Sequence, residues 1–274
     1  MSIVVNTNIA SLNAQRSLHS SGLELRDAME RLSTGKKINS AADDAAGFAI
    51  AESMTAQIRG LGMAAKNAND ALGMLKVVEN ATNDITDMLQ RIRELTVQAA
   101  SDTNTVREGA NNDDIDKLNK EAMELLKEID RVSSQTSYND KKLLSDDFSL
   151  EIQVGYNDDE SITLRTWSVN SDAIGLGDFH VRNTENALEK VSAAINTVAG
   201  YKAKWGAGQN RLEYTVANLM NVVEFTSSAR SRIQDADFAV EAARLAKAQV
   251  LQQTGAAMLA QANAAPQIAL QLIK

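Results

Sequence analysis

Residues 75–99 read LKVVENATNDITDMLQRIRELTVQA, and this stretch decides the fold. Apolar side chains and threonines recur there at steps of three and four residues, in the order Leu75, Val78, Thr82, Ile85, Leu89, Ile92, Thr96 and Ala99. Such steps place side chains on one face of an α-helix, and their repetition over several turns is typical of a coiled-coil seam. The stretch therefore predicts a long helix that packs lengthwise against another helix.

Two further stretches, Ile115–Val132 and Leu188–Thr226, carry the same pattern. Lys202 and Gln209 are polar members that weaken the middle of the second one. At about 1.5 Å per residue, that stretch predicts a helix of roughly 60 Å. The single proline, Pro266, lies near the end of the chain, so the helices can run long without a proline break.

The middle of the chain has a different texture. Apolar and polar side chains alternate over Phe148–Val154, the segment Gly155–Glu160 turns the chain, and the alternation returns at Ile162 and Leu164. Alternation with period two predicts a β-hairpin at about residues 148–166. The sequence thus predicts a mainly α fold in which long coiled-coil-like helices form a rod, with a small hairpin and with helical termini that pair.

Both termini carry thinner apolar stripes. The positions on these stripes are Leu18, Gly22, Leu25, Met29 and Leu32 near the start, and Leu251, Gly255, Met258, Ala262, Ala265, Ala269 and Leu272 near the end. Burying an alanine or a glycine removes far less apolar surface than burying a leucine, which is worth about 1.5–3 kcal/mol. We therefore expect the termini to be largely disordered in the free chain and to fold when neighbouring copies cover them.

Composition excludes several classes of function. The chain has no cysteine, which excludes disulfides, thiolate metal sites and cysteine catalysis, and His19 and His180 lack a metal-ligand pattern. A net charge of -8 disfavours nucleic-acid binding, which needs a basic face. No stretch approaches the roughly 18 apolar residues of a membrane span, and the first residues do not form a secretory signal peptide.

No motif assembles a catalytic or cofactor site, so the sequence predicts no enzyme, no cofactor and no metal. Gly35–Lys37 lacks the other residues of a phosphate-binding loop, and no nucleophile elbow occurs. Arg230 and Arg232 are interpreted as a solvated helix face or as ion-pair partners. Four acidic pairs lack calcium-loop spacing and are interpreted as capping or turn residues. These pairs are Asp43–Asp44, Asp113–Asp114, Asp146–Asp147 and Asp158–Asp159.

Several stretches resemble bacterial flagellins. RLSTG at 31–35 followed by INSAADDAAG at 38–47 is similar to the N-terminal signature of that family, and LQRIRELTVQ at 89–98 and EIDRV at 128–132 match further along. Near the other end, SARSRIQDAD, AQVLQQ and AQAN, at 228–237, 248–253 and 260–263, resemble the C-terminal signature. The resemblance covers nearly the whole chain in the right order.

The resemblance implies a subunit that self-assembles into the helical flagellar filament. Residues 1–44 plus 235–274 would form a terminal coiled-coil domain lining the inner tube, and residues 45–234 would form the wall domain. The variable outer domain is absent, since only the segment Phe179–Thr184 occupies its place. The polymerisation seam is assigned to Leu18, Leu25, Met29, Leu32, Leu251, Met258 and Leu272.

The resemblance also implies partners beyond the other subunits of the filament. They are an export chaperone that holds the C-terminal segment after Ala242, the hook-associated and cap proteins, and the flagellin-sensing Toll-like receptor of animal hosts. The subunit would be secreted unfolded through the flagellar secretion channel. Matching the receptor-binding motif gives Arg91, Leu95 and Glu128, and the helical spacing places Arg91, Leu95 and Gln98 on one stripe off the seam. We therefore expect Leu95 on an exposed face.

Three alternatives remain open at this point. A hook–filament junction adaptor shares similar termini in this family and acts in few copies. A cytoplasmic coiled-coil scaffold would form a stable soluble dimer with fully helical termini. An enzyme hidden in the wall domain is the most distant alternative, because cofactor motifs are missing and histidines are scarce.

Overall fold

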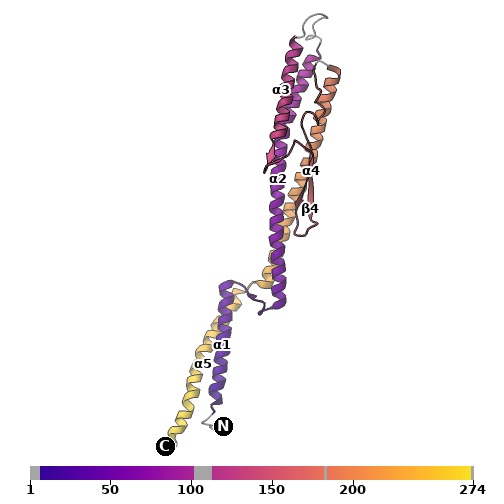
Figure 1. Ribbon diagram of the computed structural model, residues 1–274. Coiled ribbons are helices and arrows are strands. Elements are labelled where there is room, and N and C mark those ends of the chain that lie inside the picture. The colour runs from indigo at the N-terminus through magenta and orange to yellow at the C-terminus, as the bar shows by residue number, and fades with distance from the viewer. Residues whose placement is uncertain (1–6, 102–112, 182–183, 273–274) are drawn as a thin grey trace. The chain divides into compact units, whose positions relative to one another are not determined.

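The structure is a computed structural model that describes residues 7–101, 113–181 and 184–272 (Figure 1). The chain packs as two compact units, residues 1–58 with 224–274 and residues 59–223. The helices are α1 (Ile9–Thr34), α2 (Ala45–Ala99), α3 (Asp113–Gln135), α4 (Thr184–Gln234) and α5 (Phe238–Leu272). The strands are β1 (Ser137–Tyr138), β2 (Lys141–Lys142), β3 (Phe148–Gln153) and β4 (Ser161–Thr166). The prediction of a mainly α fold with a small β-hairpin and paired helical termini is confirmed.

The unit of residues 59–223 holds the large apolar core. The stripe read from the sequence of α2 is buried, and it packs with apolar side chains of α3, α4 and the hairpin β3–β4 (Figure 1). The threonines of the stripe are compatible with burial because each hydroxyl donates to a carbonyl of its own helix. Thr82 Oγ1 donates to the carbonyl of Val78 at 2.8 Å, and Thr96 Oγ1 donates to that of Ile92 at 2.8 Å. A satisfied hydroxyl avoids the penalty of burying an unpaired polar group.

The two polar positions in the α4 stripe contact α2. Lys202 Nζ donates to Asn83 Oδ1 at 2.6 Å, and Gln209 Nε2 donates to Glu79 Oε2 at 3.0 Å. Between them along α4, Trp205 is buried and its Nε1 donates to the backbone carbonyl of Arg165 at 3.1 Å. The seam therefore continues through its polar middle with hydrogen bonds at its edges and an aromatic side chain in the core.

The hairpin β3–β4 lies in the segment that the alternation predicts. It pairs Phe148 with Thr166 at one end and Gln153 with Ser161 at the other. Its turn approaches α2 closely, since a Cβ atom built on Gly60 would lie 2.8 Å from Tyr156 Cβ. Glycine at position 60 therefore allows the turn to dock on the helix.

A second hairpin, β1–β2, was not predicted from the sequence. Its two central residues have positive φ, 49° at Asn139 and 62° at Asp140. Positive φ at both positions defines a two-residue type I′ turn, for which asparagine and aspartate are suited. The Asn–Asp dipeptide between short strands was the signal for this hairpin.

In the other unit, backbone hydrogen bonds join the segment after α1 to the α4–α5 junction. Gly35, with φ 70°, ends α1, and its carbonyl accepts from Ala236 N at 2.9 Å. Lys37 N donates to the carbonyl of Gln234 at 2.7 Å. These bonds place the start of α5 beside the end of α1.

The acidic pair Asp43–Asp44 organises the entry into α2. Asp44 Oδ1 accepts from Gly47 N at 3.0 Å, which is an N-cap contact. Asp43 Oδ2 accepts from Ser40 N at 2.9 Å and from Asn39 N at 3.0 Å, and these backbone hydrogen bonds hold the pKa of the Asp43 carboxyl below its usual value. The interpretation of this pair as capping and turn residues is confirmed.

Candidate assembly surface

Helices α1 and α5 run side by side in opposite directions (Figure 1). The least exposed side chains of the pair follow one heptad stripe on each helix. These positions are Ser11, Ala14, Leu18, Ser21, Leu25, Ala28 and Leu32 on α1, and Glu241, Leu245, Ala248, Gly255, Leu259 and Ala262 on α5. About half are small residues, and Cα atoms of the two helices come within 8 Å of each other along the pair. The two backbones therefore pack closely over a thin seam.

The contact between Leu18 and Gly255 shows how the seam is built. A Cβ atom placed on Gly255 would lie 3.2 Å from Leu18 Cδ1 and 3.9 Å from Leu18 Cβ. Leucine on one helix thus sits over glycine on the other. Such pairing of large and small side chains lets two helices approach while still filling the space between them.

Polar contacts join the pair at both ends. Ser11 Oγ donates to Asn263 Oδ1 at 2.7 Å near the N-terminus of α1. At the other end, Arg31 Nη1 lies 3.2 Å from Glu241 Oε1, and Arg244 Nη1 lies 2.9 Å from the same oxygen. The side chain of Glu241 is only 6% exposed, so its charge is held by these two guanidinium groups in a nearly closed site. The sequence interpretation missed this cluster, although an acidic residue on the heptad stripe of an alanine-rich helix was a usable signal.

Large apolar side chains of this unit remain outside the seam. Met258 is 65% exposed and Ile9 is 64% exposed. The others are Leu12, Leu23, Met29, Ile50, Phe225, Phe238, Val240, Val250 and Leu251. The unit therefore packs its small residues inside and leaves many of its large ones uncovered, which is the reverse of an ordinary soluble core.

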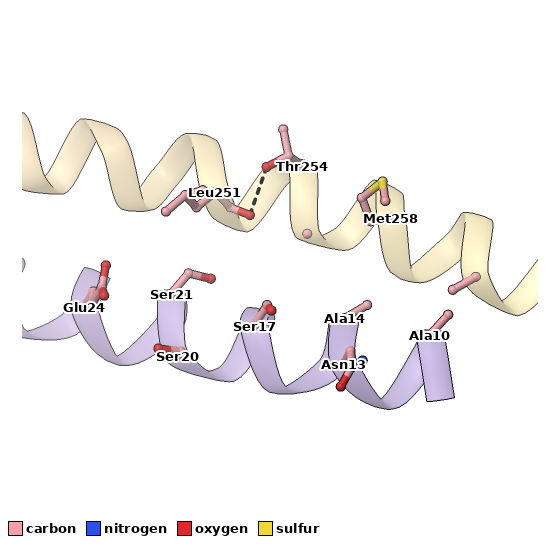
Figure 2. Close-up of a pocket in the computed structure, with 12 residues that line it drawn as sticks. Ala10, Asn13, Ala14, Ser17, Ser20, Ser21, Glu24, Leu251, Thr254 and Met258 are labelled. Carbon is pink, nitrogen blue, oxygen red and sulfur yellow. Dashed lines mark hydrogen bonds between the residues drawn. The ribbon is translucent and has the colours of Figure 1, made fainter. Parts of the chain in front are cut away.

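A groove of about 550 Å³ runs between α1 and α5 (Figure 2). Small and polar side chains of α1 form one wall, and Leu251 and Met258 of α5 lie on the other. Thr254 is not a free polar group there, because its Oγ1 donates to the carbonyl of Leu251 at 3.2 Å. A groove with one apolar and one polar wall is suited to an amphipathic helix.

The structure divides the residues assigned to the polymerisation seam into two groups. Leu18, Leu25 and Leu32 are partly buried between α1 and α5. Met29, Leu251 and Met258 are exposed outside that contact, and the side chain of Leu272 lies outside those described, as do those of Ala265 and Ala269. Their shared role in polymerisation stays a prediction.

The residues assigned to receptor binding lie on α2 and α3. Arg91 is exposed and bridges two helices, with Nη2 2.8 Å from Glu121 Oε1 and Nη1 3.1 Å from Glu94 Oε2. The hydrogen bond with Glu121, and then that with Glu94, raises the pKa of Arg91. Glu128 on α3 is partly buried, with 44% of its side chain exposed, and it forms an ion pair with Arg131, which lowers the pKa of Glu128.

The expectation that Leu95 lies on an exposed face is wrong, because its side chain is only 1% exposed. Apolar side chains of both α3 and α4 belong to the core around α2, so the buried face of α2 is wider than one seam. A second stripe of buried or partly buried side chains passes through Ala81, Ile85, Met88, Ile92, Leu95 and Ala99. Arg91 and Glu128 remain accessible for a partner, and a direct contact through Leu95 requires the core to open.

Among the described residues, no group of three or more histidine, aspartate or glutamate side chains is placed to hold a metal ion. Within the same ranges, no helix is both long and apolar enough to cross a bilayer.

Comparison with known proteins gives family matches over most of the chain. The family described as bacterial flagellin N-terminal helical region matches residues 5–149, and the bacterial flagellin C-terminal helical region matches residues 188–273. A flagellin of Halalkalibacterium halodurans is 38% identical over 99% of this chain and 100% of its own length. A flagellin of Xenorhabdus nematophila is 40% identical over 100% of both chains, and the flagellar filament 33 kDa core protein of Treponema phagedenis is 35% identical over 99% of this chain and 100% of its own.

Longer relatives also match. A flagellin of Salmonella montevideo is 42% identical over 77% of this chain, but the match covers only 41% of that protein. Among solved structures, a Bacillus cereus flagellin matches 56% of this chain and 88% of its own, with a TM-score of 0.46 and 27% identity, so the family assignment rests on the sequence matches.

Proposed function

Because the chain belongs to the bacterial flagellin family, in a short form without the variable outer domain, and is a structural subunit of the flagellar filament, we propose that it self-assembles through the α1–α5 pair. The observation that carries this proposal is the exposure of large apolar side chains on these two helices, Leu251 and Met258 beside the groove among them. Neighbouring copies would cover these side chains, and we assign the chain no catalytic role.

Burial between subunits supplies the energy for assembly. Each exposed leucine or methionine that a neighbour covers contributes about 1.5–3 kcal/mol of hydrophobic stabilisation before the cost of ordering is subtracted. A head-to-tail interface that does not close into a ring generates a helical filament. The groove would receive an amphipathic helix of an adjacent copy, so that each subunit supplies both a groove and a covering helix.

We propose that residues 1–44 plus 235–274 form the inner-tube domain and residues 45–234 the wall domain. The thin seam between α1 and α5 supports a further step, in which these helices are largely disordered in the free subunit and fold on incorporation. Amide hydrogen exchange tests this step, since strong protection of both helices in dilute monomer would contradict it.

The proposal also includes export of the subunit from the cell and capping of the filament. The chain would leave the cell through the flagellar secretion channel, with the export chaperone holding the segment after Ala242 until secretion. Val250, Leu251 and Met258 are exposed in this segment, and an exposed apolar helix face is what a chaperone would need to cover. Hook-associated and cap proteins would contact the ends of the growing filament.

Electron microscopy of purified protein, seeded with filament fragments, tests the assembly proposal. Long regular filaments are the expected result, with seeds alone and protein alone as controls. Monomer that persists with ordered termini would overturn self-assembly in favour of a hook–filament junction adaptor. A stable dimer with fully helical termini would instead favour a coiled-coil scaffold.

Recognition of the monomer by the host flagellin-sensing Toll-like receptor is a second proposed role. The observation that favours it is the accessible charged face on which Arg91 bridges α2 to α3 and Glu128 lies further along α3. Arg91→Ala should reduce receptor signalling by monomer, with Lys117→Ala, elsewhere on α3, as a matched loss of one positive charge. Undiminished signalling by Arg91→Ala would remove this role.

A further inference from the structure

The apolar seam between α1 and α5 defines its own register poorly, where register means which residue of α1 faces which residue of α5. Leu18 sits over Gly255, but residues one heptad away on α5 are Ala248 and Ala262, which are nearly as small. A slip by seven residues would therefore put Leu18 over another small side chain. Packing of small residues alone distinguishes weakly between these arrangements.

The ion cluster at the other end of the seam does not tolerate that slip. A shift of seven residues moves one helix by roughly 10 Å along the other. Arg31, which now lies 3.2 Å from Glu241 across the pair, would be carried out of reach, and a carboxylate that is 6% exposed would lose its cross-helix partner. Removing one partner of a buried charge is strongly unfavourable.

We propose that Arg31 and Glu241 are the side-chain determinants of register in the α1–α5 pair, acting together with the backbone hydrogen bonds that join Gly35 and Lys37 to Ala236 and Gln234. Ser11 and Asn263, hydrogen-bonded at 2.7 Å near the opposite end, act in the same sense but more weakly, because both groups are uncharged and Asn263 is exposed. Arg244 has a different task. It contacts the same oxygen of Glu241 at 2.9 Å but belongs to the same helix, so it shields the charge without linking the helices.

Register matters because it decides which α5 side chains stand beside the groove. In the observed register, Leu251, Thr254 and Met258 lie opposite the small and polar side chains of α1 (Figure 2). A slipped pair would present a different surface to any neighbour. The inference rests on the geometry of the pair alone and holds whether or not the groove is the assembly site.

The chain has no cysteine, which allows the register to be read by engineered disulfides. A Cβ atom on Gly255 would lie 3.9 Å from Leu18 Cβ, within the range of about 3.5–4.5 Å that a disulfide requires. The test protein is the full chain carrying Leu18→Cys, Gly255→Cys and Ala248→Cys together. In a glutathione buffer its disulfides exchange to equilibrium. Because a link holds α1 beside α5 and lowers the entropy cost of pairing, the ratio of links compares the two registers even though the unlinked helices are largely disordered in the free subunit. Mass spectrometry of peptides then gives the ratio of the 18–255 link, which reports the observed register, to the 18–248 link, which reports the slipped one.

We expect the 18–255 link to predominate by about tenfold or more in this protein, since the slip breaks a buried ion pair. Glu241→Gln and Arg31→Gln should each lower the ratio by about threefold or more, while the backbone hydrogen bonds after α1 still favour the observed register. Arg244→Gln is the matched control, because it also removes a guanidinium from Glu241, and it should leave the ratio nearly unchanged.

Two results would overturn the inference. One is an unchanged ratio in both Glu241→Gln and Arg31→Gln. The other is an equal fall in Arg244→Gln, which would assign the effect to general charge balance. Filament growth is scored separately, so that loss of filaments with an unchanged ratio counts against the register role but not against assembly through this pair.

Discussion

The two units of the molecule pack helices in opposite ways. In the unit of residues 59–223, large side chains such as Leu75, Leu89 and Leu212 are fully buried, and α2, α3 and α4 are held apart by them. In the unit that contains α1 and α5, the seam is made of serine, alanine and glycine with a few leucines, and side chains such as Met258 and Leu251 remain exposed outside it.

The difference implies that the unit of residues 59–223 is stable by itself, whereas the unit of α1 and α5 depends on neighbouring subunits for its stability. Fully buried leucines supply the first unit with its own core, at about 1.5–3 kcal/mol for each side chain. The α1–α5 seam supplies much less, and single pairs of helices are marginal without further burial. Substitutions in the two units should therefore affect different measurements, folding in one and assembly in the other.

The largest expected effect is on assembly. Leu251→Asp and Met258→Asp should each abolish polymerisation while leaving residues 59–223 folded, because a carboxylate buried under a neighbouring subunit is costly. Electron microscopy of seeded protein measures filaments. Fluorescence of Trp167 and Trp205, the only two tryptophans, reports the fold of residues 59–223.

Gln249→Asp serves as the control for that experiment, since it places the same charge on an exposed face of α5 away from the groove lining. Normal filaments from either Leu251→Asp or Met258→Asp would refute the assignment of these two residues to the polymerisation seam. Loss of the tryptophan signal in these variants would show that substitutions on α5 also unfold residues 59–223, and the two units would then not be independent.

The next effect is on stability. Leu89→Ala removes a fully buried side chain from the large core and should lower the free energy of unfolding of residues 59–223 by about 2–5 kcal/mol. Leu18→Ala, which truncates a leucine of the thin seam, should leave that transition unchanged. Urea unfolding followed by tryptophan fluorescence compares the two. A shift of similar size in both variants would mean that the units fold as one and that the comparison fails.

Sequence periodicity predicted the large core well because each element there follows the apolar spacing of its own secondary structure. The steps of three and four residues on α2 end on side chains that are buried, and the alternation around Phe148–Thr166 ends in a paired hairpin. The prediction that Leu95 is exposed failed because a heptad stripe describes contact with one partner helix, whereas side chains from two helices surround α2. Counting the second stripe through Met88 would have required knowing that both of the other predicted helices pack against this one.

In the terminal pair the sequence was ambiguous for a different reason. Helix α5 carries two stripes that share Glu241, Ala248, Gly255 and Ala262, one with Leu245 and Leu259 and one with Leu251 and Met258. Either stripe satisfies the spacing rule, and nothing in the spacing says which one faces α1 and which one is left for another chain.

Two neighbouring glycines of α2 offer a matched test of how tightly the hairpin is docked. Gly60→Ala would bring a Cβ to 2.8 Å from Tyr156 Cβ, so the turn must move, and we expect a loss of about 1–3 kcal/mol. Gly62→Ala meets nothing within 4 Å and should stabilise the helix by about 0.5–1 kcal/mol. Thermal unfolding of both variants checks the sign. If both variants are stabilised, the hairpin is loosely held, and the unit of residues 59–223 is less stable by itself than its core indicates.

The smallest expected effect is the response to acid, and it should be alike in the two units. Hydrogen bonds from Ser40 and Asn39 lower the pKa of Asp43 in one unit, and those from Asn157 lower the pKa of Glu160 in the other. A lowered folded pKa means that each carboxylate contributes stability above its unfolded pKa of about 4, and that this stability is lost as pH falls through the folded value. Both groups are exposed, so the contribution is small and screened by salt.

NMR titration of the two carboxyl groups, with Asp146 as an exposed comparison, measures these values directly. The carboxyl groups of Asp43 and Glu160 should both titrate below their ordinary range while the local fold persists. A normal value for Asp43 together with a lowered one for Glu160 would show that the segment before α2 is not held in the free subunit, which would extend the dependence on neighbours from α1 and α5 to the segment that follows α1.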